Sequence, residues 1–233
     1  MKKKIVILTG AGISAESGLK TFRDMGGLWE NFAIEDVASP EGWRRNPELV
    51  LDFYNQRRKQ AFAALPNAGH LALAKLEEFF EVKIITQNVD GLHEKAGSSF
   101  VIHLHGELSK VRSVHNEALV KDIGSAFIEL GDLAEDGAQL RPHIVWFGEQ
   151  VPMIEVAAEI CQEADIFMVI GTSLQVYPAA GLLSYVPSGV PVYVIDPSTP
   201  SYSFNSTDVR FVQKTAVEGV PVVVEELINT HKK

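Results

Sequence analysis

Residues 5–15 read Ile-Val-Ile-Leu-Thr-Gly-Ala-Gly-Ile-Ser-Ala, so a short β-branched run leads directly into a glycine-rich turn. From Gly10 to Ala15 the turn follows the G-x-G-x-x-G/A pattern. In that pattern a tight turn and a helix N-terminus bring backbone N–H groups close to a pyrophosphate. A plain strand-to-helix turn is the alternative. The stretch therefore predicts an α/β fold whose first strand ends at a candidate nucleotide site.

Further short apolar runs alternate with helical patterns along the chain. The β-branched runs predict strands over residues 82–86, 166–171, 190–196 and 209–212. Helices are predicted over 70–80, 152–164 and 216–229, and another begins at Pro47, where Asn46 can cap it. The alternation predicts one α/β unit of 233 residues, with a Rossmann-like, largely parallel sheet and helices on both faces.

Two stretches do not fit this alternation. Residues 27–66 have helical patterns where a second parallel strand would be expected, and residues 107–140 are polar and mixed. We expect both stretches to be insertions that together build a small second domain on the main sheet.

The composition limits the compartment and the partners. The formal net charge of −9 argues against nucleic acid or an anionic membrane surface as a partner. No run approaches the roughly 20 apolar residues of a membrane span, and we expect a cytoplasmic protein. Cys161 is the only cysteine, so neither an internal disulfide nor a cysteine-built zinc site can form.

The region after the glycine-rich turn argues against a hydride-transfer dehydrogenase. Such an enzyme usually has a second strand that ends in an acidic residue about 20 positions further on, whereas residues 22–30 are not strand-like. Phe22, Arg23 and Trp29 instead suggest a flap that closes over a bound nucleotide.

Polar side chains follow three other predicted strands. Gln87, Asn88 and Asp90 could hold ribose hydroxyls or a carboxamide, and a capped turn is the alternative. The Gly-Thr-Ser stretch 171–173 comes at the end of another strand, and Asp196 ends a further one. Because the carboxyl ends of parallel strands meet at one edge of a sheet, we expect these groups to line one crevice.

Strand alternation places His103 and His105 on one face of the run 101–105, and Gly106 marks a break at its end. A neutral imidazole at a strand end could deprotonate a sugar hydroxyl near pH 7. A structural histidine and a two-histidine metal site are the alternatives. No third ligand is evident in the sequence, which argues against a metal, and His105 is the candidate base.

Together these motifs resemble the sirtuin family of NAD-dependent protein-lysine deacylases. The matching stretches occur in family order: residues 10–24 (GAGISAESGLKTFRD), 86–93 (TQNVDGLH), 103–108 (HLHGEL), 140–149 (LRPHIVWFGE) and 171–173 (GTS). The resemblance implies a Rossmann-like domain, a small domain, and NAD in the crevice between them. It also implies that an acyl-lysine carbonyl oxygen attacks the nicotinamide ribose, giving nicotinamide, O-acyl-ADP-ribose and free lysine.

The resemblance also implies roles for individual residues. It makes His105 the catalytic base and places Asn88 at the reacting end. The implied NAD contacts are Gly10, Ala11, Gly12, Ile13, Ser14, Phe22, Arg23, Trp29, Gln87, Asn88, Asp90, Gly171, Thr172, Ser173, Asp196, Ser198 and Ala216. The substrate is an acylated-lysine segment of another protein, expected to pair with a strand formed by Val145, Trp146, Phe147, Gly148 and Glu149.

Two residues concern the acyl group. Tyr54 and Arg57 lie at positions i and i+3 of the helix predicted from Pro47, so they share a face. They match the Tyr-x-x-Arg pair of sirtuins that are associated with negatively charged acyl groups. A phenol and a guanidinium can hold a distal carboxylate, so the pair predicts succinyl or malonyl substrates. A solvated helix face is the alternative.

The chain departs from the family in its insert. Most sirtuins hold a structural zinc there with two Cys-x-x-Cys pairs, whereas this chain has Ser113 near the first pair and no cysteine in the region. We therefore expect no zinc. Apolar packing is expected to replace it, through Leu119, Val120, Ile123, Phe127, Ile128 and Leu133. Asp196 stands where the family more often has Asn, and a carboxylate still suits ribose hydroxyls.

Two other functions remain open. An NAD glycohydrolase or mono-ADP-ribosyltransferase would pass ADP-ribose to another acceptor, and a non-catalytic sensing module would bind NAD or ADP-ribose without turnover. The peptide-pairing stretch 145–149 argues against the first, and intact His105, Asn88 and Asp90 argue against the second.

Overall fold

The computed structural model describes residues 2–19, 28–29, 32–198, 206 and 208–232, and a six-stranded parallel sheet is its main feature. The strand order is β11-β10-β9-β1-β4-β5. The strands are β1 (Lys4–Thr9), β4 (Glu81–Thr86), β5 (Val101–His103), β9 (Ile166–Ile170), β10 (Val192–Ile195) and β11 (Val209–Val212). This is the strand order of a Rossmann sheet. From β1 the chain first adds strands on one side and then returns to add strands on the other, and ligands of such sheets bind at this switch point. The predicted fold class is confirmed.

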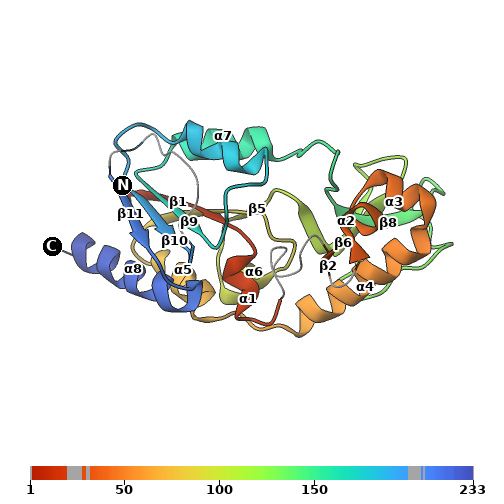
Figure 1. Ribbon diagram of the computed structural model, residues 1–233, viewed down its shortest axis with the longest axis horizontal. Helices are drawn as coiled ribbons and strands as arrows, with labels where there is room; N and C mark the ends of the chain where they lie inside the picture. The colour runs from red at the N-terminus through yellow and green to blue at the C-terminus, as the bar shows by residue number, and fades with distance from the viewer. Residues whose placement is uncertain (1, 20–27, 30–31, 199–205, 207, 233) are drawn as a thin grey trace.

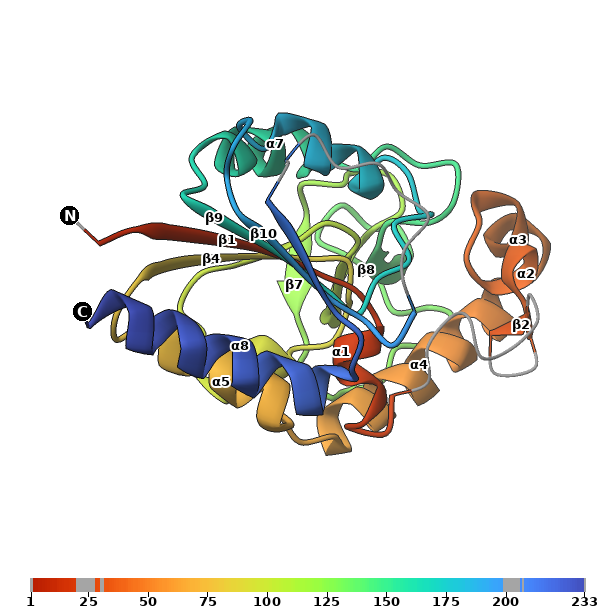
Figure 2. The same ribbon diagram turned by 60° about the vertical axis from the view of Figure 1, so that its left-hand side comes forward.

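Helices cover both faces of this sheet (Figures 1 and 2). Ile5 and Ile7 of β1 pack toward α5 (Ala68–Leu76) and α8 (Ala216–His231). Val6 and Leu8 alternate to the other face and pack toward α7 (Ile154–Gln162) and the 3-10 helix η1 (Ala179–Tyr185). A strand that is buried on both faces has apolar residues at every position and no alternation with polar ones, which explains the continuous apolar run at residues 5–8.

The remaining elements form a small lobe, residues 28–29, 32–63 and 106–149, beside the carboxyl ends of the strands (Figure 1). Its elements are β2 (Leu28–Trp29), β3 (Phe32–Ala33), α2 (Ile34–Val37), α3 (Pro40–Arg45), α4 (Pro47–Ala63) and the antiparallel sheet β7-β6-β8, with β6 (Gly106–Ser113), β7 (Val120–Asp122) and β8 (Leu140–Ile144). Helix α4 begins as predicted, because the Asn46 side chain accepts from the Leu49 N–H and Pro47 fits the first turn.

The apolar packing predicted for the cysteine-free insert is wrong for half of the named residues, and Leu119 is only partly buried. Ile128 is buried against Leu51, Val111 and Leu140, with Ile123 partly buried beside them. Val120, Phe127 and Leu133 are exposed. Hydrogen bonds connect the loops of the insert instead, among them the one from Ser113 Oγ to Asp136 Oδ2. No helix in the described part of the chain is both long and apolar enough to cross a membrane.

Candidate active site

The glycine-rich turn packs backbone to backbone against the loop that follows β9. The N–H of Gly10 donates to the Ile170 carbonyl over 3.0 Å, and that of Gly12 donates to the Gly171 carbonyl over 2.9 Å. A Cβ on Gly12 would lie 2.6 Å from the Gly171 Cα, and Gly171 itself has a φ of 62°. Loop packing therefore requires glycine at both positions. Ala11 is half-buried beside them, and helix α1 (Gly12–Ala15) is only four residues long, so its dipole contribution is small.

Ser14 connects this turn to the loop that follows β4. Its hydroxyl donates to Asp90 Oδ2 and accepts from Asn88 Nδ2, each over 3.1 Å. All three side chains are buried. Burial raises the pKa of Asp90, against the opposing hydrogen bonds from the Leu92 N–H and the Ser14 hydroxyl. The structure thus joins three of the predicted site residues in one buried network, whereas Ile13 buries its side chain in the core.

Gln87 connects the same loop to the carboxyl ends of β1 and β9. Its N–H donates to the Thr9 carbonyl over 2.9 Å, and its Nε2 donates to Thr172 Oγ1 over 3.1 Å. The Thr172 hydroxyl also accepts from the Leu174 N–H over 3.3 Å, and Ser173 between them is half-buried. The ends of β1, β4 and β9 therefore converge, as expected for a parallel sheet.

His105 is oriented by this loop. Its Nδ1 lies 2.9 Å from the Gln87 carbonyl oxygen, which can only accept, so Nδ1 carries the hydrogen and Nε2 is left as the basic nitrogen. Burial lowers the pKa of His105, and the Gln87 carbonyl opposes that shift only in part. The imidazole is therefore neutral near pH 7 and can take up a proton at Nε2.

His103 contacts the backbone carbonyl of the next residue in this loop, Asn88. Its Nδ1 lies 2.9 Å from the Asn88 carbonyl oxygen and its Nε2 lies 2.8 Å from Glu94 Oε1, so both nitrogens face acceptors. Burial by itself lowers the pKa of His103, but the hydrogen bond and charge of Glu94 raise it and the net direction is upward. When both nitrogens carry a proton, His103 can donate to both acceptors and hold the loop that carries Asn88.

We expect His103→Gln to destabilise the protein in a pH-dependent way. The pKa of His103 is raised on folding, so its stabilising effect is fully present below the ordinary value of 6.5 and is lost as the pH rises through the folded value. The free energy of unfolding should fall by about 1–2 kcal/mol at pH 6 and by less at pH 8.5. Urea unfolding at both pH values measures this.

His115→Gln is the matched control for His103→Gln, because His115 is exposed. The pKa of Glu94 is lowered, so its own titration falls below this pH range. An equal loss of stability at pH 6 and pH 8.5 in His103→Gln would contradict the assignment of a protonated His103.

The residues predicted to contact the adenosine side of NAD lie one strand further along the sheet. Asp196 directly follows β10 and is buried, and its Oδ1 accepts from the Ser198 N–H over 2.8 Å. The Gly171 N–H donates to the Ile195 carbonyl over 3.0 Å, which places Asp196 beside the Gly171 loop. Ala216 is the first residue of α8 and its side chain is buried in the core, so only its backbone could touch a ligand.

Three of the expected NAD contacts belong to the predicted flap. Phe22 and Arg23 lie outside the described residues. For Trp29 only the backbone is described, in the β2 strand that pairs with β3. Their predicted contacts with NAD therefore stay predictions.

Tyr54 and Arg57 are buried on α4, so the alternative of a solvated helix face is wrong for this pair. Their exposed fractions are 0% and 7%. The Tyr54 hydroxyl accepts from Trp146 Nε1 over 3.1 Å. The pair thus belongs to the buried interior of the small lobe, and Tyr54 contacts the stretch where substrate binding is predicted.

Residues 145–149 form a turn, and the expectation of a strand there is wrong. Strand β8 ends at Ile144, and Gly148 has a φ of 91°, a left-handed conformation that ends pairing. The Val145 N–H donates to the His105 carbonyl over 2.9 Å. Trp146 is buried, Glu149 is mostly buried, and Phe147 and Gly148 are exposed at the tip.

Sequence reasoning missed the polar layer beneath these loops. Thr9 Oγ1 donates to Thr86 Oγ1 over 2.8 Å and lies 3.0 Å from His93 Nε2. The rings of His70 and His93 stack edge to face at 5.0 Å. A threonine at the end of both β1 and β4 was the available signal, since these positions pair across the sheet.

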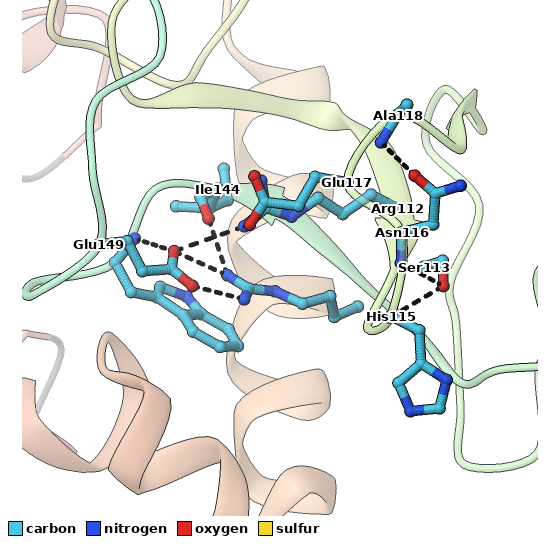
Figure 3. Close-up of polar contacts among 10 residues, drawn as sticks. Arg112, Ser113, His115, Asn116, Glu117, Ala118, Ile144 and Glu149 are labelled. Atoms are coloured by element: carbon cyan, nitrogen blue, oxygen red, sulfur yellow. Dashed lines mark hydrogen bonds and ion pairs between the residues drawn. The ribbon is translucent and has the colours of Figure 1, made fainter.

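The insert does not fit a zinc ion. Within the described ranges, no group of three or more His, Cys, Asp or Glu side chains is placed to hold a metal. The Ser113 hydroxyl donates to Asp136 Oδ2 over 2.7 Å. It also accepts from the N–H groups of His115 and Asn116 (Figure 3). This hydrogen-bonded turn ties together loops of the insert that are distant in the sequence.

Comparisons with known proteins agree with this geometry. The Sir2 family profile matches residues 10–178. A Bacteroides thetaiotaomicron protein named NAD-dependent protein deacylase is 55% identical, over 97% of this chain and 98% of its own length. A Helicobacter pylori J99 protein of the same name is 52% identical, over 97% of this chain and 96% of its own length.

Solved structures give the same result. A complex of a Sir2 homologue with NAD superposes with a TM-score of 0.86 at 36% identity, covering 99% of this chain and 91% of that one. A mutant Sir2 homologue bound to ADP-ribose gives a TM-score of 0.88 at 35% identity, covering 99% and 94%. With its motifs, strand order and strand-end network all in agreement, the chain belongs to the Sir2 family, the sirtuins.

Proposed function

We propose that this protein removes succinyl or malonyl groups from lysine side chains of other proteins, with NAD as co-substrate and His105 as base. The chain is a NAD-dependent protein-lysine deacylase: it belongs to the Sir2 family, and relatives at 55% and 52% identity are named NAD-dependent protein deacylases. The observation that carries the proposal is the His105 imidazole, oriented by the Gln87 carbonyl next to the network of Ser14, Asn88 and Asp90.

The strand ends fit NAD. The closely packed glycine turns at Gly10–Gly12 and Gly171 present backbone next to buried polar side chains, which suits a pyrophosphate and two riboses. Asp196 beside β10 suits the adenosine ribose hydroxyls, and Asn88 suits the nicotinamide end. When bound, NAD supplies the ribose carbon that accepts the acyl oxygen.

His105 supplies the base. Its Nδ1–H is held by the Gln87 carbonyl, so Nε2 can take a proton from a ribose hydroxyl without first changing tautomer. The lowered pKa of His105 keeps this nitrogen unprotonated at neutral pH. Val145 donates to the His105 carbonyl, which couples the base to the turn where the peptide would bind through the exposed Phe147 and Gly148.

Tyr54 and Arg57 would select the acyl group. Both are buried on one face of α4, where hydrogen bonds to a charged group are stronger than at a surface. A guanidinium and a phenol offer a directional, charge-assisted site for a carboxylate. An acetyl group offers these side chains nothing to bind, so the pair favours succinyl and malonyl groups.

Nicotinamide release tests the proposal. Purified protein is mixed with NAD and one of three matched peptides, carrying succinyl-lysine, acetyl-lysine or unmodified lysine. The proposal predicts release with acylated peptides only, and faster release with succinyl-lysine. Release without any acylated peptide would support the glycohydrolase or ADP-ribosyltransferase function, and tight NAD binding without release would support a sensing module.

Metal removal should leave the protein unaffected. Because Ser113 and Asp136 bond to each other in the insert, we expect 1,10-phenanthroline or EDTA to change neither the midpoint of thermal unfolding nor nicotinamide release. Elemental analysis of the purified protein should find zinc well below one equivalent. Loss of activity on chelation that added zinc restores would contradict this expectation.

A further inference from the structure

The contact between Trp146 and Tyr54 determines which group donates and which accepts. An indole N–H can only donate, so the Tyr54 oxygen accepts in the 3.1 Å hydrogen bond from Trp146 Nε1. The phenol hydrogen is therefore directed away from Trp146. A hydroxyl whose orientation is set in this way can act as a donor to a carboxylate without losing rotational freedom on binding.

Trp146 is itself held by two charged residues. Its backbone N–H donates to Glu149 Oε2 over 2.8 Å, and its ring lies under the Arg141 guanidinium, whose Cζ is 3.3 Å from the ring centroid. Arg141 donates to both Glu149 oxygens, over 2.7 and 3.1 Å. A bidentate pair with a stacked guanidinium is geometrically specific, so it determines the position of the indole.

The Glu149 carboxylate faces the protein interior. Arg112 lies 3.5 Å from it, and the side chains of Arg112 and Arg141 are only 5% and 9% exposed. Figure 3 shows Glu149 directed toward Arg112 and the strand that carries Ile144. Two buried guanidinium groups share this carboxylate, which also accepts from the Trp146 backbone, so the Glu149 side chain holds Trp146 in place.

We propose that Trp146, held by the Arg141–Glu149 pair, is a positioning residue that favours carboxylate-ended acyl groups by directing the Tyr54 hydroxyl. This inference rests on the proposed function and deepens it. It assigns selectivity to a residue 92 positions away from Tyr54 in the sequence.

Trp146→Phe tests this inference, because it keeps an aromatic ring and removes the indole N–H. We measure kcat and KM for succinyl-lysine and acetyl-lysine peptides. The ratio of the two kcat/KM values, succinyl over acetyl, should fall about 5-fold, the effect of losing one hydrogen bond. Glu149→Gln should lower the same ratio and also the thermal midpoint, and Arg141→Lys should lower the ratio because lysine has no planar group to stack.

Two matched controls separate a change in acyl selectivity from a general destabilisation of the small lobe. Trp43→Phe makes the same exchange in the ring that packs on Trp146 at 5.8 Å, and Glu41→Gln breaks the exposed pair with Arg44. Both should leave the ratio unchanged. The inference is overturned if the succinyl-to-acetyl ratio of kcat/KM in Trp146→Phe stays within 2-fold of wild type. It is also overturned if the ratio falls equally in Trp43→Phe. A wild-type protein without preference for succinyl-lysine overturns the acyl part of the proposed function as well.

Discussion

Replacing His105 with alanine is expected to lower kcat for succinyl-lysine peptides by about 10²- to 10⁴-fold, the usual contribution of a positioned general base. The imidazole is the group whose Nδ1–H is fixed by the Gln87 carbonyl and whose lowered pKa leaves Nε2 basic at neutral pH. Steady-state formation of deacylated peptide, followed by mass spectrometry, measures the loss.

The control for His105→Ala is His115→Ala, because His115 is an exposed histidine of the small lobe. The activity of this control variant should stay at the wild-type level. NAD binding by the His105 variant should persist, because Ser14, Asn88 and Asp90 are bonded to one another and not to the imidazole. A His105→Ala protein with more than a tenth of wild-type kcat would remove His105 from the role of base.

Arg57→Met is expected to lower kcat/KM for succinyl-lysine peptides by about 100-fold and to affect acetyl-lysine peptides much less. The substitution keeps an unbranched side chain in the buried position and removes the charged donor that would hold the distal carboxylate. Kinetics with the two peptides, run side by side, measure the change in their ratio.

Arg57→Lys should recover only part of the selectivity, since an ammonium group cannot bind a carboxylate in a bidentate way. Arg44→Met removes an exposed guanidinium of α3 and serves as the matched control. Equal losses for both peptides in Arg57→Met would mean that Arg57 supports the fold of the small lobe and not the choice of acyl group.

Much of the fold could be predicted because local signals and global packing agree. The uninterrupted apolar run of β1 reflects burial on both faces of a parallel sheet. Asn46 and Pro47 mark the start of α4 through cap chemistry that depends on few neighbours. The convergence of the strand ends is predictable for the same reason, since parallel strands bring their carboxyl ends to one edge of the sheet.

The small lobe was harder to predict because its decisive contacts are distant in sequence. The turn at residues 145–149 depends on the left-handed Gly148 and on Glu149 bonding back to the Trp146 N–H. The Trp146–Tyr54 hydrogen bond and the Ser113–Asp136 hydrogen bond leave no periodic signal. Exposed Phe127 and Leu133 also show that apolar residues in a polar segment need not form a core.

The most direct test is to identify the products formed from NAD and a succinyl-lysine peptide by liquid chromatography and mass spectrometry. A deacylase that uses His105 as base predicts nicotinamide, O-succinyl-ADP-ribose and free-lysine peptide in equal amounts, and none of these products with unmodified peptide. Nicotinamide and free ADP-ribose formed at the same rate with or without the acylated peptide would contradict it.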